Sequence, residues 1–449
     1  MNMKKKVTIL GAGFSGLTLA YYLNKLGVEV QIYEKKETVG GLIQAKKTPF
    51  GFYETAANGL MGQKHVYNFL EEAGISYRRS SDKAKKRFIF RRSSKHRWPL
   101  SLSETLRLIV QVLRKIIINR KNKIPQKQET VLDWGQRNLT PEGVRFLLQP
   151  ALQGIYASHI KSLSATLILG SLFRENKSNH AASEKEISRS KNNKKGGLLS
   201  GENGTQDLLF QLSENLKKNG VMINLSVNHE ETLECIQESH YKNEKIVIAT
   251  SAQDALALLS NEYLRQKYKD EYDFLDQIKT IPIVTVTVFV KEKPQDQHIG
   301  FGCIFPEGEG VRALGVLMNG VIYSRESSYH SETWIFGGEV DPEFLNLSDA
   351  DIKDVIKDSR QKVFQSTHDV LDICITRYQK ALPHYTLEHE KNLNEYFKKQ
   401  EAAKSHDLYL HGNYMGVIGL SKILQRSQDL AKQIKNEIDR EQTHNKEIL

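Results

Sequence analysis

The chain has 449 residues, of which 39% are hydrophobic and 26% charged, and this composition excludes a disordered or fibrous protein and fits two or three folded domains. Its 64 Lys and Arg residues against 53 Asp and Glu residues give a net charge of +11, which favours an anionic partner, although no recognised motif supports nucleic acid. The three cysteines (Cys235, Cys303 and Cys374) are too scattered for a metal site or a disulfide framework, and no apolar run is long enough to span a bilayer.

The N-terminal segment predicts a strand, a turn, a helix and a second strand. Residues 7–10 (VTIL) form a short apolar run, as expected of a buried parallel strand. The hexamer GAGFSG (11–16) follows, and apolar residues then recur at helical spacing over 17–26. Residues 28–32 alternate as a second strand, and Glu34 comes directly after it.

This unit matches a dinucleotide-binding fingerprint. Gly11 permits the tight turn, Gly13 lets the backbone approach a pyrophosphate, and Gly16 lets the helix pack on the strand. The N-terminus of the helix offers N–H groups to the phosphates, and Glu34 is placed to accept hydrogen bonds from ribose hydroxyls. The alternative is a glycine-rich turn in another α/β protein, but the complete set of strands, helix and acid favours a dinucleotide.

Strands of the same kind return later in the chain. In chain order the pattern predicts a helix within 61–80, a strand at 86–90, a helix at 101–120, helical structure over 141–173, a helix at 205–218, strands at 221–227, 244–250 and 281–290, paired strands within 300–340, a helix at 350–368, and a strand at 408–414 followed by a helix from about 416. The strand at 281–290 alternates as if half-buried. Nucleotide-type strands thus occur at the start, middle and end of the chain, an interleaving typical of large flavoproteins.

Several segments resemble one family, in order along the chain. The FAD fingerprint of the flavin amine-oxidase superfamily is matched at Gly11, Gly13, Gly16, Glu34, Gly40 and Gly41. Within that superfamily the chain resembles the oxygen-dependent protoporphyrinogen oxidase family, including its bacterial coproporphyrinogen-oxidising relatives. The segments that carry this resemblance are KRFIFR (86–91), LLQPALQGIYASHIKSLSA (147–165), GTQDL (204–208), KIVIATSAQDALALL (245–259), GFGCIFPEGEGVRALGVLMNG (300–320), ALPHYTLEH (381–389) and LYLHGNYMGVIGLSKIL (408–424). Thr38, residues 54–61 and Ser421 depart from the family's usual pattern.

The resemblance implies an α/β (α+β) fold with several parts. These are a discontinuous Rossmann-type FAD-binding domain (1–60, 197–262 and 400–440), a substrate-binding sheet domain (61–84 and 265–398) and a helical, membrane-associating domain (85–173). Residues 174–196 are polar and charged and predict a mobile loop.

The resemblance also implies an FAD-dependent oxidase of haem biosynthesis. Such an enzyme converts protoporphyrinogen IX to protoporphyrin IX by passing hydride to flavin N5, and O2 reoxidises the flavin with release of H2O2. No catalytic side chain is then required, and the sequence shows no catalytic triad and no metal-ligand set. The alternatives are oxidation of coproporphyrinogen III, an amine oxidase or desaturase of the same fold, and an FAD-binding relative that has lost turnover.

The cofactor contacts follow from the matched segments. We expect FAD to contact Gly11, Gly13, Phe14, Ser15, Gly16, Glu34, Lys35, Gly40, Gly41, Leu42, Gly412, Asn413, Gly416 and Val417. Gly412, Asn413 and the helix start near Gly416 would bring backbone N–H groups toward the flavin or the pyrophosphate. The alternative for this last segment is a plain strand–helix turn.

The substrate is an apolar macrocycle with propionate carboxylates, so its site needs apolar walls and a guanidinium at the rim. Arg87, in the matched KRFIFR segment, is the candidate for the propionate contact, and the alternative is a solvated Arg within a basic patch. The candidates to clamp the ring faces are Leu314, Leu317, Trp334 and Phe336, for each of which ordinary sheet core is the alternative.

The helix at 101–120 carries an apolar stripe flanked by Arg and Lys residues. It can lie on an anionic membrane surface or be a core helix with a solvated basic face, and the resemblance favours the membrane. The apolar run near the N-terminus is too short for a signal peptide, so we expect a cytoplasmic protein, peripheral on the inner face of the cell membrane. The expected partners are porphyrinogen, O2 and an anionic membrane, without nucleic acid, and a homodimer is left open.

Overall fold

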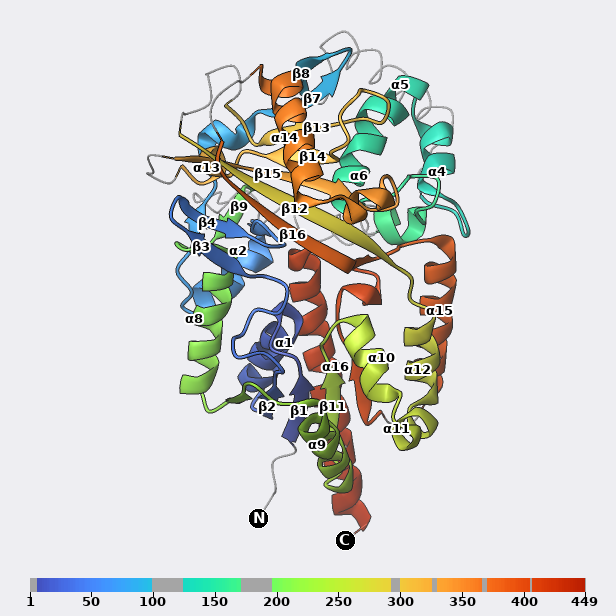
Figure 1. The fold of residues 1–449 in the computed structure, drawn as a ribbon. Coiled ribbons are helices and arrows are strands. Elements are labelled where there is room, and N and C mark those ends of the chain that lie inside the picture. Colours follow the sequence, from blue (N-terminus) through green and yellow to red (C-terminus); the bar gives the residue numbers. More distant parts are fainter. Residues whose placement is uncertain are drawn as a thin grey trace, which may run out of the picture.

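The computed structural model describes residues 6–98, 124–170, 196–291, 299–324, 329–365, 370–403 and 406–448. Figure 1 shows two stacked units. The lower unit contains both chain ends and is built around a parallel sheet, while the upper unit is built around a larger sheet with a group of helices beside it (Figure 1).

A five-stranded parallel sheet forms the lower unit, in the order β10-β2-β1-β11-β17. Its strands are β1 (Lys6–Leu10), β2 (Glu29–Tyr33), β10 (Met222–Asn224), β11 (Lys245–Ile248) and β17 (Leu408–Leu410). Because β1 pairs with β2 on one side and β11 on the other, and β17 pairs with β11, segments from the start, middle and end of the chain lie side by side. This order confirms the predicted discontinuous Rossmann-type fold.

Helices cover both faces of this sheet, which explains why β1, β11 and β17 are mostly apolar and buried. Val7 and Ile9 pack with α1 (Phe14–Lys25), α8 (Thr205–Lys218) and α16 (Leu420–Ile448). Ile246 and Ile248 point to the opposite face and pack with α9 (His229–Tyr241) and α10 (Ala252–Leu259). The helix predicted at 205–218 is confirmed.

The upper unit contains a seven-stranded mixed sheet. Its strands, in spatial order, are β16 (Val370–Pro383), β12 (Thr280–Val290), β15 (His330–Gly337), β14 (Gly315–Leu317), β13 (Gly302–Ile304), β7 (Arg87–Arg91) and β8 (Ser94–Trp98). Helix α14 (Asp349–Phe364) packs against one face of it. All neighbouring strands are antiparallel except β13 and β7.

The alternation at 281–290 predicted a half-buried strand. Strand β12 is instead buried on both faces. Val284 and Val286 face the core beneath α14. Thr285 points to the opposite face, where its hydroxyl donates to the Thr55 carbonyl at 3.5 Å. The alternation is real, but the polar side faces the lower unit, and Thr285 is only 8% exposed.

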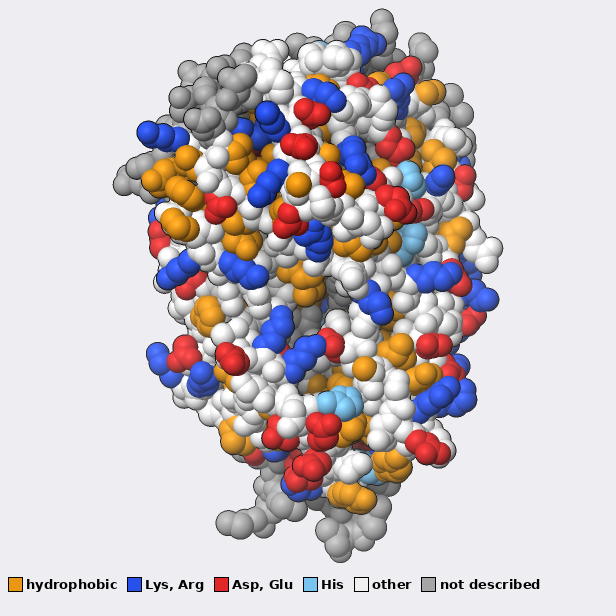
Figure 2. All heavy atoms as spheres, viewed as in Figure 1, with side chains coloured by type: hydrophobic (Ala, Val, Ile, Leu, Met, Phe, Trp, Pro, Cys, Tyr) orange, Lys and Arg blue, Asp and Glu red, His pale blue; other side chains and the backbone are white. Residues whose placement is uncertain are grey.

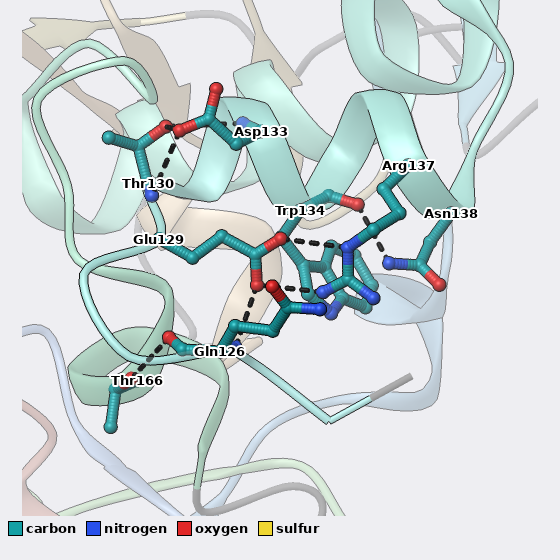
Figure 3. Close-up of polar contacts among 8 residues, drawn as sticks. All are labelled: Gln126, Glu129, Thr130, Asp133, Trp134, Arg137, Asn138 and Thr166. Carbon is teal, nitrogen blue, oxygen red and sulfur yellow. Dashed lines mark hydrogen bonds and ion pairs between the residues drawn. The ribbon is translucent and has the colours of Figure 1, made fainter. Parts of the chain in front are cut away.

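Glu129 organises the start of the helical group (Figure 3). Its carboxylate is 7% exposed and accepts hydrogen bonds from Arg137 Nε at 2.9 Å, Arg137 Nη2 at 2.7 Å and the Gln126 backbone N–H at 2.8 Å. Helix α4 (Val131–Asn138) begins after Thr130, whose hydroxyl accepts from the Asp133 N–H in a capping box. These contacts fix the helix start in place.

The helical run predicted from 141 is distorted and then interrupted. Its parts are α5 (Pro141–Gly143), a turn of π-helix η2 (Val144–Leu148) and α6 (Gln149–Tyr156). Pro150 cannot donate a backbone hydrogen bond, and the Phe146 carbonyl instead accepts from Trp98 Nε1 at 3.2 Å. The run ends at Ala157, which has a left-handed φ of 50°.

Two segments lie in a different unit from the one expected. Helix α2 (Lys64–Glu72), expected in the substrate-binding domain, packs Val66 and Leu70 into the core of the lower unit. Strands β7 and β8, expected among the helices, extend the seven-stranded sheet. The helix predicted at 101–120 and nearly all of the loop predicted at 174–196 lie outside the described residues.

The remaining elements are β3 (Ala45–Thr48), β4 (Gly51–Glu54), β5 (Leu60–Met61), β6 (Arg78–Arg79), η1 (Asp82–Lys85), β9 (Leu198–Ser200), α11 (Glu262–Lys267), α12 (Lys269–Asp276), α13 (Asn319–Ile322), η4 (Pro342–Asn346), α15 (Leu387–Ala402) and η5 (Asn413–Met415). Over the described part of the chain, no helix combines the length and the apolar character needed to cross a membrane.

Candidate functional site

A cavity of about 1040 Å³ lies between the two units. The face drawn in Figure 2 is hollowed near its middle, with Lys and Arg side chains around the hollow. We call the two sides of the cavity the nucleotide wall and the sheet wall. The nucleotide wall consists of the lining residues within 10–43, 227–258 and 412–423. The sheet wall consists of Ile283, Thr285, Leu317, Ile335 and the lining residues within 378–383. The nucleotide wall follows the carboxyl ends of β1, β11 and β17, where ligands bind to open parallel sheets.

Glycine is required at the three fingerprint positions for different structural reasons. Gly11 has a φ of +105°, and a Cβ there would lie 3.0 Å from the Ala249 carbonyl oxygen. A Cβ at Gly16 would lie only 2.0 Å from the Gly11 carbonyl oxygen, so this glycine allows α1 to pack on the turn. A Cβ at Gly13 would approach only the Gly41 Cα, at 3.8 Å. Gly13 therefore leaves room for a ligand, while Gly16 does not line the cavity.

A second glycine loop lies beside the first. Gly40 and Gly41 both have positive φ, and the Gly40 N–H donates to the Ala12 carbonyl at 2.9 Å. Gln206 of the GTQDL segment holds this loop, because its Oε1 accepts from the Ala45 N–H at 2.9 Å and its Nε2 donates to the Val39 carbonyl at 3.2 Å. The residues predicted here, Gly40, Gly41 and Leu42, all line the cavity.

Glu34 is buried beside the first turn. It is 6% exposed, its Oε2 accepts from the Ala12 N–H at 2.7 Å, and its Oε1 accepts from the Lys36 N–H at 3.0 Å. Each carboxylate oxygen has a second lone pair, so Glu34 can still accept from ribose hydroxyls. Lys35 also lines the cavity, and its ammonium pairs with Asp254 at 2.6 Å.

The C-terminal segment reaches the cavity with partly different residues from those predicted. Gly412 and Asn413 line it, but Gly416 and Val417 do not. Residues 413–415 form the 3-10 turn η5, Gly416 follows with a φ of 85°, and α16 begins only at Leu420. The helix N-terminus therefore lies later than predicted, and residues 418–420 take the place expected for Gly416 and Val417.

A buried polar chain joins the helices behind this wall. His411 Nε2 lies 2.8 Å from the Ser427 hydroxyl, which lies 2.8 Å from the Thr18 hydroxyl. Burial, and to a lesser extent the charge of Arg426, lowers the pKa of His411 to about 3, so the ring is neutral at pH 7. The chain links α1 to α16, both of which begin at the cavity.

The nucleotide wall thus fits a dinucleotide. The open position at Gly13, the backbone N–H groups at the start of α1 and the buried carboxylate of Glu34 match a pyrophosphate and a ribose. Phe14 and Ser15 line the same wall.

On the sheet wall, the predicted aromatic contacts are wrong. Trp334 and Phe336 are fully buried on the far side of β15, where they stack on Phe305 and Phe344 with ring centroids 5.7 and 4.1 Å apart. Because side chains alternate along a strand, Ile335 lies between them on the cavity side. Leu317, also predicted, lines the cavity.

Leu314 and Arg87 do not line the cavity either. Leu314 is 3% exposed and packs in a small core cluster with Ile281 and Ile283. Arg87 begins β7, which three strands separate from β12, and its guanidinium lies 5.1 Å from the centroid of the Phe301 ring. The structure therefore does not place Arg87 at the substrate cavity.

Other lining residues were not predicted as contacts. Asn58 and Gly59 belong to the 54–61 segment that departs from the family pattern. Ala157 lies on the cavity at the end of α6, and its carbonyl accepts from the Glu339 N–H at 2.8 Å. Tyr378 and Lys380 come from β16, for which no element was predicted from the sequence.

Comparison with known proteins supports a flavin enzyme. The family model described as flavin containing amine oxidoreductase matches residues 14–418. Protoporphyrinogen oxidase 2 of Arabidopsis thaliana is 24% identical over 93% of this chain and 91% of its own length. Protoporphyrinogen oxidase of Dictyostelium discoideum is 22% identical over 96% and 99% of the two chains. A crystal structure from Exiguobacterium sp. 255-15, provisionally assigned as a protoporphyrinogen oxidase, has the same fold, with a TM-score of 0.71 and 18% identity over 96% of this chain and 99% of that one.

Proposed function

The chain belongs to the flavin-containing amine oxidoreductase family, and on this premise we propose that it is an FAD-dependent oxidase of protoporphyrinogen IX. The products are protoporphyrin IX and, with O2 as the electron acceptor, H2O2. The relatives from Arabidopsis thaliana and Dictyostelium discoideum, both protoporphyrinogen oxidases matched over nearly their whole length, support this substrate.

The observation that carries the proposal is that one cavity has two unlike walls. The nucleotide wall has the glycine turn and Glu34, which suit a dinucleotide. The sheet wall opposite is largely apolar, with Ile283, Leu317 and Ile335 among its side chains. An apolar wall facing a flavin site suits a large apolar substrate that must lie against the flavin ring.

When bound, FAD would supply the hydride acceptor, and the residues of the chain would bind and orient the two reactants. The nucleotide wall would hold the dinucleotide through backbone N–H groups and Glu34. The sheet wall would exclude water and hold the macrocycle against the flavin.

An amine substrate, the main alternative within the family, is less well suited to this cavity. Among the described residues, no carboxylate lies on the sheet wall to pair with an ammonium group. The charged group that does lie there, Lys380, would repel one.

Aerobic turnover of the purified protein with protoporphyrinogen and coproporphyrinogen side by side tests the proposal. Porphyrin fluorescence and peroxide release would be followed together, and a protein-free control would correct for autoxidation. We expect FAD-dependent porphyrin formation that is faster with protoporphyrinogen.

A faster rate with coproporphyrinogen would keep the chemistry and change the substrate. A protein that holds FAD but gives no rate above the control with either substrate would contradict the proposal. Membrane attachment and dimer formation stay predictions from the sequence. The helix expected on the membrane, at 101–120, lies outside the described residues.

A further inference from the structure

Lys380 lies on the cavity beside a break in the regular pairing of β16. Ile281 of β12 pairs with Leu382 and Ile283 pairs with Tyr378, so residues 379–381 together lie opposite Pro282. Proline has no N–H to donate to a neighbouring strand, and extra residues opposite such a position form a bulge. Tyr378, Lys380 and Leu382 line the cavity as alternate residues of the strand, and the bulge adds Ala381 between them.

Lys380 is exposed where it lines the cavity, and no acidic side chain of the described residues lies on its wall. The cavity's acidic side chains within the described residues are Glu34 and Asp254, and both belong to the nucleotide wall. Glu34 is already bonded to two backbone N–H groups and Asp254 to Lys35. Lys380 is therefore the cationic side chain of the sheet wall within the described structure.

The other lysines near the cavity have partners. Lys35 pairs with Asp254 at 2.6 Å, and Lys36 Nζ donates to the Gly41 carbonyl at 2.9 Å. Lys279, next to β12 but outside the cavity, pairs with Glu388 at 2.6 Å. Among the described residues, none forms an ion pair or a hydrogen bond with the Lys380 ammonium, which leaves its three N–H donors for a ligand.

We propose that Lys380 binds a carboxylate of the substrate and so selects apolar acids over neutral or cationic molecules. The dinucleotide phosphates are the competing anions, but the glycine turn and the helix N-termini that suit them lie on the opposite wall. The inference rests on the proposed function only for the identity of the acid: the porphyrinogen propionates are the carboxylates in question.

The test compares the variants K380M and K380R with the wild type and with a control, K279M, whose lysine is exposed directly before β12 but outside the cavity. The probes are mesoporphyrin IX, a stable dicarboxylate, and its dimethyl ester, both titrated by fluorescence into the FAD-loaded protein. We expect K380M to weaken binding of the acid about tenfold and to leave binding of the ester unchanged, because only the acid offers a charged acceptor. K380R should bind the acid nearly as well as the wild type, and K279M should match it.

Three results would overturn the inference: equal effects of K380M on acid and ester, no effect on either, or loss of FAD from K380M, which would assign the lysine to the cofactor. The same variants titrated with biphenyl-4-carboxylate and its methyl ester separate this inference from the proposed function. Acid-selective binding that depends on Lys380, in a protein that does not oxidise porphyrinogen, keeps the inference and rejects the proposed function. If K380M oxidises porphyrinogen with an unchanged KM, the proposed function is kept and the inference about Lys380 is rejected.

Discussion

The two walls of the cavity differ in what makes them. The nucleotide wall depends on main-chain geometry, since glycines at 11, 13, 40, 41 and 412 bring backbone atoms close to the cavity. The sheet wall is made of side chains that face the cavity from β12, β14, β15 and β16. Main-chain requirements impose particular residues at particular spacings, whereas a side-chain wall requires only apolar residues on the correct face.

The largest expected effect on stability comes from Trp334, whose neighbour on β15, Ile335, faces the opposite side of the sheet. Trp334→Ala removes a fully buried indole stacked on Phe305 and should lower the free energy of unfolding by about 3–5 kcal/mol. Ile335→Ala, on the cavity side, should cost less stability and raise the KM for porphyrinogen. Denaturant unfolding and steady-state kinetics on both variants check this pair. A raised KM in a folded Trp334 variant, with none in the Ile335 variant, would reverse the assignment of the faces.

A second pair separates packing from ligand binding within the glycine turn. Gly16→Ala puts a Cβ 2.0 Å from the Gly11 carbonyl oxygen and should destabilise the protein with or without FAD. Gly13→Ala meets nothing nearer than 3.8 Å in the protein and should fold normally, yet bind FAD about tenfold to a hundredfold more weakly, because the added methyl group occupies ligand space. Thermal unfolding of the FAD-free proteins and FAD titration measure the two effects. Normal FAD affinity in Gly13→Ala would contradict the assignment of this wall.

The buried hydrogen bonds that join His411, Ser427 and Thr18 behind the nucleotide wall predict that the stability of the protein depends on pH. The pKa of His411 is about 3 in the folded protein and 6.5 ordinarily, so below pH 6.5 the unfolded chain takes up a proton that the folded protein does not. The free energy of unfolding should therefore fall as the pH drops from about 6.5 toward 4, by about 1.4 kcal/mol per pH unit from this histidine. Denaturant unfolding at several pH values, on the wild type and His411→Gln, measures the contribution. A difference between the two proteins that does not change with pH would show that His411 does not titrate in this way.

The smallest effect is expected at Arg87. Its guanidinium lies over the Phe301 ring and away from the cavity, so Arg87→Ala should leave the KM for porphyrinogen within about twofold and FAD content unchanged. Kinetics of this variant beside K380M show which cation faces the substrate. A large rise in KM for Arg87→Ala alone would restore the sequence-based prediction.

The sequence predicted the nucleotide wall well because its elements are local. Gly11, Gly13, Glu34 and the flanking strands lie within one stretch of chain. The three residues all line the cavity, and the two strands pair in parallel as predicted. The start of α16 was misplaced because the extra turn η5 and the left-handed Gly416 have no periodic signal.

The residues of the sheet wall could not be predicted from the sequence, for a different reason. On a strand buried on both faces, the apolar pattern does not tell which side meets the cavity. Trp334 and Phe336 were therefore chosen, although Ile335 is the residue that lines the cavity. Lys380 was missed because no strand was predicted for β16, whose pairing with β12 joins segments far apart in the chain.

The most direct test of the central claim is anaerobic mixing of the FAD-loaded protein with protoporphyrinogen, followed by admission of O2. We expect the absorbance of oxidised flavin to disappear as porphyrin forms, and to return with release of peroxide when O2 is admitted. A bound flavin that stays oxidised in excess protoporphyrinogen, in a protein that binds mesoporphyrin normally, would contradict the claim and identify a binding protein without this chemistry.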